Sequence, residues 1–241
     1  MFNTSNFGKY IEYLGRCVDN DLEKMVLKFL PKGKNIKYLD IGCFDGVKTL
    51  KRAGYIGTKY ISGIDLPTPG AKMAEKNGVK VIYSDLDKKW PLADKSVDCI
   101  TATEVIEHSV DVDNFLSEIK RILKPNGRLI ITTDNLAGYH NIFALITGNQ
   151  PYTGPYLSRI YPIGHRPNAK YYNVREINSM RPHLNVMTAK ALKQLLHYYN
   201  FDILFQGGAG MYPLPPFMSR LAAFLSKNHA SHCFFCAIQK D

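Results

Sequence analysis

The sequence predicts an α/β fold with a doubly wound parallel sheet, and three observations carry the prediction. Short apolar segments suited to buried strands alternate with segments of helical periodicity. The apolar run 36–41 leads into a turn with glycines, after which 47–53 can begin a helix. The next two strand-like runs, 60–65 and 80–85, each end in a carboxylate. A strand, a glycine turn and a helix N-terminus together can form a ligand-binding edge of a sheet.

Each further element follows from its own pattern. A helix is expected over 20–30, with an N-cap at Asn20 or Asp21 and Pro31 beyond its end. The residues before it, 1–18, are polar and aromatic and are expected to form an N-terminal arm. Amphipathic spacing predicts a helix over 111–123, and Thr188 suits the cap of a helix over 188–199. The remaining strands are expected over 96–103, 128–133, 201–206 and 232–239.

The glycine turn and the two strand-end acids suit a nucleoside ligand. Gly42 and Gly46 let the backbone approach a ligand, and N–H groups at a helix N-terminus accept a carboxylate or phosphate. Asp65 is placed to bind ribose hydroxyls, and Asp85 lies where an adenine would extend. The same residues also suit an ordinary strand-to-helix turn. The turn has neither the GxxxxGK[ST] pattern of triphosphate sites nor the third glycine of the dinucleotide fingerprint.

Five segments, in this order and spacing, make the chain resemble the class I S-adenosylmethionine-dependent methyltransferases: 39–46, 63–66, 84–86, 103–108 and 123–131. The likeness extends to the methyltransferase type 11 and ubiquinone-pathway O-methyltransferases. It implies a Rossmann-like sheet of seven strands, mostly parallel with an antiparallel last strand, and helices on both faces. It also implies S-adenosylmethionine as methyl donor and S-adenosylhomocysteine as product.

The resemblance also implies which residues hold the donor. Asp40 and the glycine turn should bind its amino-acid end, Asp65 its ribose, and Asp85 with Leu86 its adenine. The full expected set of donor-binding residues is Asp40, Gly42, Cys43, Asp45, Gly46, Asp65, Leu66, Asp85, Leu86, Thr103 and Glu104. In related enzymes an N-terminal arm often folds over the donor, so the arm 1–18 is a candidate for further contacts.

The segment Glu104-Val-Ile-Glu107-His108 follows the fourth strand and contains the residues expected to act in methyl transfer. On a helix these three polar residues would share one face, where they could bind a divalent cation such as Mg²⁺, with His140 or His165 as a fourth ligand. The segment is similar to that of O-methyltransferases that hold such a metal. In the alternative, which we favour, no metal is bound and His108 is the general base or orients the loop.

Residues 134–187 are rich in glycine, proline and aromatics and are expected to form a lid over the acceptor within a single domain, 1–241. A short apolar helix is expected at 139–146. The lid favours a small-molecule or lipid-linked acceptor, with oxygen as the methylated atom. The alternatives are an RNA 2′-O-methyltransferase and a non-catalytic donor-binding protein.

The amino-acid composition indicates which kinds of partner the protein can bind. The chain has 31 Lys and Arg against 21 Asp and Glu, a net charge of +10, which favours anionic partners such as nucleic acid or an acidic membrane surface. It is also consistent with lysine-rich solvated faces. Five cysteines in mostly apolar segments, with no signal peptide, favour a cytoplasmic protein. No segment has the apolar length of a membrane span, but the apolar stretch 210–225 suits either a packed helix or peripheral contact with lipid.

Overall fold

The computed structural model describes residues 4–158, 163–165 and 182–240, and within them the strands form one seven-stranded sheet of order β3-β2-β1-β4-β5-β7-β6. In chain order the strands are β1 (Tyr38–Ile41), β2 (Ile61–Asp65), β3 (Lys80–Tyr83), β4 (Val97–Thr103), β5 (Leu123–Asp134), β6 (Phe201–Ala209) and β7 (His232–Gln239). Pairing is parallel from β3 to β5, and β7 is antiparallel to both of its neighbours. The predicted Rossmann-like sheet is therefore confirmed.

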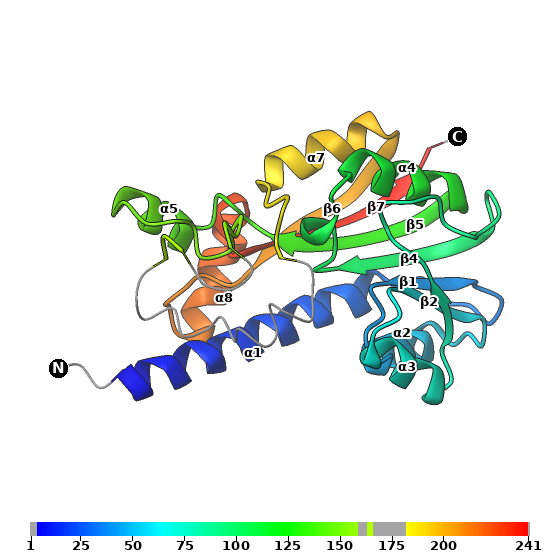
Figure 1. Ribbon diagram of the computed structural model, residues 1–241, viewed down its shortest axis with the longest axis horizontal. Coiled ribbons are helices and arrows are strands. Elements are labelled where there is room, and N and C mark those ends of the chain that lie inside the picture. The colour runs from blue at the N-terminus through cyan, green and yellow to red at the C-terminus, as the bar shows by residue number, and fades with distance from the viewer. Residues whose placement is uncertain (1–3, 159–162, 166–181, 241) are drawn as a thin grey trace.

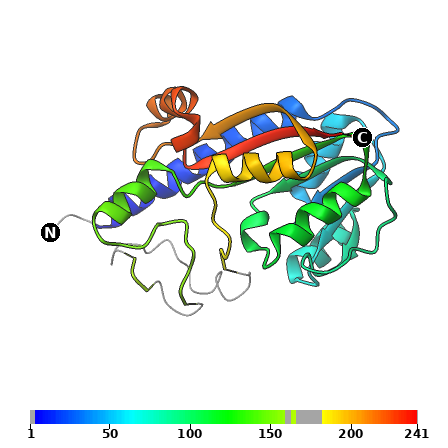
Figure 2. The same cartoon turned by 90° about the horizontal axis from the view of Figure 1, so that it is seen from above.

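Helices cover both faces of this sheet (Figures 1 and 2). One face carries α1 (Thr4–Phe29), α2 (Val47–Ile56) and α3 (Pro69–Lys76), and the other carries α4 (Val112–Ile122) and α7 (Ala189–Tyr198). Apolar residues of β1, β4 and β5 are buried in two main clusters, one against α1 and α2 and the other against α4 and α7. The sheet is thus the central layer of three.

Helix α1 corrects the expectation of a separate N-terminal arm. The helix predicted over 20–30 begins at Thr4 and runs without a break to Phe29. Leu14, Val18, Leu22 and Val26 are all buried, so the four-residue apolar spacing extends back into the supposed arm. Residues 4–18 therefore lengthen a helix packed on the sheet.

Strand β5 is also longer than predicted. It was expected over 128–133 but begins at Leu123, which pairs with Val97. Asn126 has a left-handed backbone, φ 61°, so the Pro-Asn-Gly sequence turns the chain within the assigned strand instead of separating it from α4.

The carboxyl ends of the parallel strands all meet one edge of the sheet, and β7 begins at that same edge. Around it lie the 3₁₀ turn η1 (Ile106–His108), α5 (Tyr139–Ile146), α8 (Pro216–Leu225) and the 3₁₀ turn η2 (Lys227–His229). Helix α5 has the predicted bounds. Among the described residues, no helix is both long and apolar enough to cross a lipid bilayer.

Candidate active site

The turn between β1 and α2 can adopt its conformation only with glycine at two positions. Gly42 and Gly46 have left-handed backbones, with φ of 72° and 78°. A Cβ on Gly42 would lie 2.6 Å from a methyl of Val105, and one on Gly46 would lie 3.1 Å from the Ala74 backbone. The turn therefore packs tightly and brings the N-terminus of α2 to the carboxyl edge of the sheet.

Asp65 lies beside this turn at the end of β2. Its carboxylate accepts hydrogen bonds from the backbone N–H groups of Phe44, at 2.9 Å, and Leu66, at 2.7 Å. Burial raises the pKa of Asp65, and these two N–H groups oppose the effect. A carboxylate oxygen can accept more than one hydrogen bond, so both oxygens still have capacity for ribose hydroxyls. The geometry at Asp65 fits the predicted role.

Asp40 occupies a different setting. It is buried below the turn, and its carboxylate accepts from Thr49 Oγ1 at 2.6 Å, Thr101 Oγ1 at 2.5 Å and Arg52 Nη1 at 3.1 Å. Arg52 in turn donates to Glu23 of α1 at 2.8 Å. Asp40 thus anchors a buried network that fixes β1, β4 and α1, and the amino-acid end of a donor would meet the backbone of the turn first.

The other predicted donor residues lie around the same edge. The Asp45 side chain accepts from the backbone N–H of Val47, the first residue of α2, at 3.1 Å. The Cys43 side chain is buried, which raises the pKa of its thiol to about 12, and only its backbone faces the turn's ligand side. The Leu86 carbonyl accepts from Trp90 and Asn114, which fixes the loop after β3. Asp85 holds that loop too, accepting from Asp87 N at 3.1 Å.

The structure separates the residues predicted to share one helical face. Glu104 follows the last residue of β4 and has a left-handed backbone, φ 56°. Glu107 and His108 lie on the 3₁₀ turn η1, so no α-helix begins at residue 104. The carboxylate of Glu104 accepts from Thr132 Oγ1 at 2.7 Å and lies 3.7 Å from His232 Nε2. The predicted metal set of Glu104, Glu107 and His108 is therefore divided between two groups. Thr103, also predicted to bind donor, instead accepts from Arg52 Nη2 at 3.3 Å.

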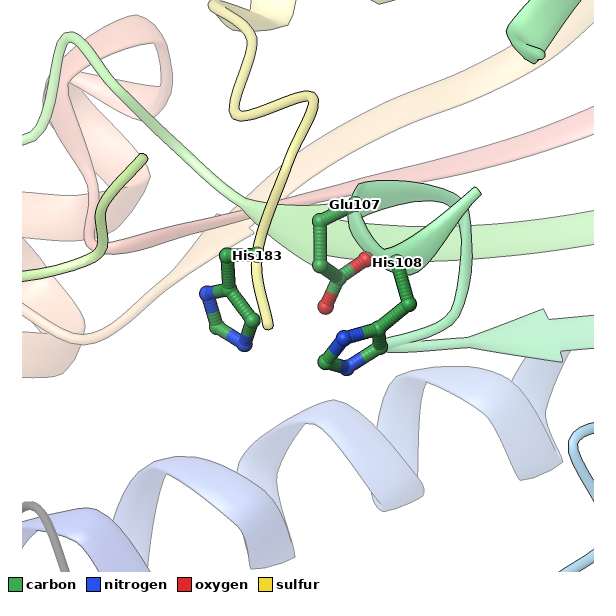
Figure 3. A group of neighbouring side chains, drawn as sticks. All are labelled: Glu107, His108 and His183. Carbon is green, nitrogen blue, oxygen red and sulfur yellow. The ribbon is translucent and has the colours of Figure 1, made fainter. Parts of the chain in front are cut away.

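The first group consists of Glu107, His108 and His183, whose side chains converge as Figure 3 shows. The imidazole rings of His108 and His183 lie 4.7 Å apart, edge to face. Glu107 is fully buried. Its Oε2 accepts from Thr133 Oγ1 at 2.8 Å, and its Oε1 has no hydrogen-bond partner among the residues that the structure describes. Burial and then the charge of Glu104 raise the pKa of Glu107 well above its ordinary value. Both effects favour the protonated, uncharged form of Glu107.

His183 is oriented by Asp134, the last residue of β5. Its Nδ1 lies 3.1 Å from Asp134 Oδ2 and 2.8 Å from the carbonyl oxygen of Thr153. Both neighbours are acceptors, so Nδ1 carries a proton and Nε2 faces the group. Burial acts against the charged ring, but the bond to Asp134 outweighs it and raises the pKa of His183 to about 9. His183 is therefore a cation at neutral pH.

Asp134 also belongs to the second group, with Glu104 and His232. His232 Nε2 lies 3.3 Å from Asp134 Oδ1. Burial opposes ionisation of Asp134, yet the hydrogen bond from His183 and the charge of His232 lower its pKa overall. Nearby, burial lowers the pKa of His140 to about 4, so that ring is neutral.

Sequence reasoning missed Asp134 and His232 as site residues, and it did not single out His183 from the other histidines of the lid segment 134–187. Its sequence position could have indicated Asp134, because it is an acid that directly follows a predicted strand, as Asp65 and Asp85 end theirs. His232 begins the antiparallel strand, and only the sheet order brings it to this edge. Of the two histidines proposed as a fourth metal ligand, neither is among the groups found in the described residues. The lid residues 159–162 and 166–181, with several of its aromatics, lie outside the described residues.

The donor side fits S-adenosylmethionine through a turn that only glycine permits and a carboxylate with spare acceptor capacity at the end of β2. The acceptor side offers two imidazoles and a buried carboxylate with one unpartnered oxygen, a donor set that also suits a divalent cation. Both sides open on the same edge of the sheet, as the fold class requires for a bound ligand.

Comparison with known proteins agrees with this geometry. Residues 13–206 match the family described as "Methyltransferase domain". The ubiquinone biosynthesis O-methyltransferase of Pelagibacter ubique is 29% identical over 177 residues, which cover 71% of this chain and 68% of that protein. The human mitochondrial protein of that name is 31% identical over 109 residues, 42% of this chain and 29% of its own length.

Solved structures show the same fold. An S-adenosylmethionine-dependent methyltransferase from Mesorhizobium loti has a TM-score of 0.63 at 16% identity, covering 92% of this chain and all of that one, 100%. A possible histamine N-methyltransferase from Thermotoga maritima has a TM-score of 0.61 at 16% identity, covering 99% of this chain and 96% of that one. Because the family match spans most of the chain, the protein belongs to the methyltransferase domain family and is an S-adenosylmethionine-dependent methyltransferase.

Proposed function

We propose that the protein transfers the methyl group of S-adenosylmethionine to an oxygen atom of a small-molecule or lipid-linked acceptor. The names of the relatives, ubiquinone biosynthesis O-methyltransferases, support oxygen as the acceptor atom. The observation that carries the proposal is the convergence of Glu107, His108 and His183 at the sheet edge that also holds Asp65. A cytoplasmic setting is part of the proposal and is supported by five free cysteines.

The donor supplies an activated methyl group, so the protein mainly has to hold donor and acceptor in line and exclude water. Asp65 would accept hydrogen bonds from the ribose hydroxyls, and the turn 42–46 would present backbone N–H groups to the amino-acid end. Asp85 and Leu86 would border the adenine. Asp40 would not contact the donor itself. Its hydrogen bonds with Arg52 and Thr49 would keep the turn in place.

On the acceptor side His108 and His183 would have different roles. His183, held as a cation by Asp134, would attract the acceptor oxygen as its negative charge develops. His108, whose ring lies against that of His183, would take the proton from the acceptor hydroxyl. The oxygen lone pair freed in this way would attack the methyl carbon as the bond from that carbon to the donor's sulfur breaks, and S-adenosylhomocysteine would leave. The raised pKa of Glu107 favours its uncharged form, which would not repel an anionic oxygen.

A divalent cation is the second candidate for the chemistry of this group. Glu107, His108 and His183 would hold it, and Asp134 behind His183 would form the carboxylate–imidazole arrangement common at metal sites. The unpartnered Oε1 of Glu107 supports this alternative. The cation would act as a Lewis acid on the acceptor oxygen. Glu104 would not be a ligand, because its carboxylate lies with Thr132 and His232.

Two treatments separate the alternatives. The wild type is assayed for methyl transfer with and without EDTA, and His108→Ala is assayed without it, with exposed His197→Ala as the matched control. We expect EDTA to have no effect and His108→Ala to slow turnover roughly 10²–10⁴-fold, the usual range for acid–base catalysis. Loss of transfer with EDTA, at unchanged donor affinity, would instead establish the metal. An unaffected rate in both experiments would mean that the acceptor pocket lies elsewhere.

A further inference from the structure

Helix α8 exposes its large apolar side chains to solvent, whereas an ordinary surface helix buries them. Its buried residues are the small Ser219 and Ala223, while its large apolar side chains face outward. These outward residues, which we call the α8 surface, are Phe217, Met218, Leu221, Phe224 and Leu225, with exposed fractions between 52% and 80%. Packing on the protein therefore does not account for the apolar character of this helix, and a contiguous exposed patch of this kind marks an interaction site.

A groove lies behind the α8 surface, between α1, β6 and α8. Its volume is about 490 Å³, within the range of ligand-binding cavities. Met25, Phe205, Phe224 and Leu225 line it. Its floor is the end of edge strand β6, where three of the five residues 206–210 are glycines. The groove exists because this stretch of the sheet edge carries few side chains.

The charges around the groove are mostly positive. The sequence has no Asp or Glu between 203 and 240. Arg220 and Lys227 line the groove together with Asp21, and Asp21 already pairs with Arg220 at 2.7 Å and Lys24 at 3.7 Å. Two cations therefore line the groove with one carboxylate, and that carboxylate is already paired with Arg220. Apolar side chains that project outward beside a cationic side chain such as Lys227 suit an anionic lipid headgroup with its acyl chains.

We propose that the α8 surface and its groove dock on a lipid bilayer that contains anionic lipids. The large side chains would enter the acyl region, Lys227 and Arg220 would meet the headgroups, and the groove would take part of an acyl chain. Helix α5 also carries exposed apolar side chains, Leu145 and Ile146, which are 55% and 79% exposed.

This surface adjoins the acceptor side of the active site. Tyr139 at the start of α5 stacks on His229, just after α8, with ring centroids 5.0 Å apart, and His140 lies 5.6 Å from Tyr212, just before α8. An acceptor dissolved in the bilayer would reach the histidines from this end, a consequence that rests on the proposed function. Docking itself does not depend on the acceptor's identity.

Flotation of the full-length protein with vesicles tests the proposal without any methyl transfer. Vesicles of phosphatidylcholine alone are compared with vesicles that also contain phosphatidylglycerol, at low and high salt. We expect flotation with the anionic vesicles and its reduction by salt. The double variant Phe224→Ser, Leu225→Ser should lower the partition coefficient about tenfold or more, because two exposed apolar anchors are removed.

Matched controls come from α7. Tyr198→Ser removes a side chain that is 79% exposed there and should not change flotation. Lys227→Glu should weaken binding to anionic vesicles, whereas Lys190→Glu, also exposed, should not. Absence of flotation, or equal flotation of the double variant and the wild type, would overturn the proposal. So would a wild-type dimer in light scattering that the double variant dissociates, because the surface would then bind a second copy.

Discussion

At the scale of single residues, Asp65 is the clearest link between sequence and donor binding. Its carboxylate lies at the turn and is partly buried, with two backbone N–H groups holding it in place. We expect Asp65→Ala to weaken S-adenosylmethionine binding by about 2–3 kcal/mol, because the ribose hydroxyls would lose a charged acceptor. Calorimetry measures the affinity, with Asp98→Ala at the other end of the sheet as control. Unchanged affinity in Asp65→Ala would place the ribose elsewhere.

His183 gives the molecule a pH-dependent stability. Its pKa is raised to about 9 in the fold, against an ordinary value of about 6.5, so folding favours the protonated ring. The stabilisation is therefore complete below about pH 6.5 and is lost as the pH rises through about 9. The shift corresponds to about 3 kcal/mol as an order of magnitude.

Urea unfolding between pH 6 and pH 10, roughly the window of that titration, measures this effect. We expect the wild type to lose stability across the window and His183→Gln to lose much less, so that the difference between the two proteins falls as the pH rises. A difference that stays constant with pH would mean that Asp134 does not hold His183 in its charged form.

At the scale of elements, the buried ion network decides how α1 is attached. Arg52 of α2 lies between Glu23 of α1 and Asp40 of β1, and its side chain is 2% exposed. Removing it leaves the buried Asp40 without its cation and leaves Glu23 with Lys51, which lies 4.0 Å away. We expect Arg52→Ala to lower the free energy of unfolding by about 3–5 kcal/mol.

Lys48 on the same helix provides the control. It pairs with Asp19 at the surface, where both side chains are about half exposed, so Lys48→Ala should cost less than about 1 kcal/mol. Denaturant titrations of both variants make the comparison. Equal losses of stability would show that the network around Arg52 contributes no more than a surface ion pair.

Most elements could be predicted from sequence because their periodicity is local. Helix α5 matches its expected bounds, and Thr188 caps α7 by accepting from Ala191 N at 3.1 Å. The start of α1 was missed because its polar and aromatic first turns concealed the spacing of Leu14 and Val18. Apolar periodicity predicts which face of a helix is buried. When only a few residues of the helix are buried, the periodicity is too weak to show where the helix begins.

The sequence suggests the candidate residues of the donor side, but only some of those that the structure brings together on the acceptor side. Asp65 and the glycines follow each other closely along the chain, so a local motif identifies them. Asp134, His183 and His232 are far apart in sequence and meet only through sheet order. The separation of Glu104 from Glu107 depends on one backbone angle, the positive φ of Glu104, and residue spacing does not indicate it.

At the scale of the whole molecule, the net charge and the residues of the acceptor side favour different partners. The charge of +10 favours any polyanion, including RNA. The acceptor-side residues that the structure describes, however, are a buried carboxylate and histidines beside apolar helices. We expect RNA binding to be weak and to disappear with salt, in proportion to the phosphates neutralised. Filter binding at two salt concentrations tests this, and salt-resistant binding would contradict it.

Label transfer from tritiated S-adenosylmethionine into a cell extract, separated into lipid, small-molecule and RNA fractions, tests the central claim most directly. The account predicts label in the lipid or small-molecule fraction, on an oxygen, and its loss in His183→Gln while donor affinity measured by calorimetry stays unchanged. Strong labelling of RNA, or a His183→Gln variant that transfers methyl groups at the wild-type rate, would contradict it.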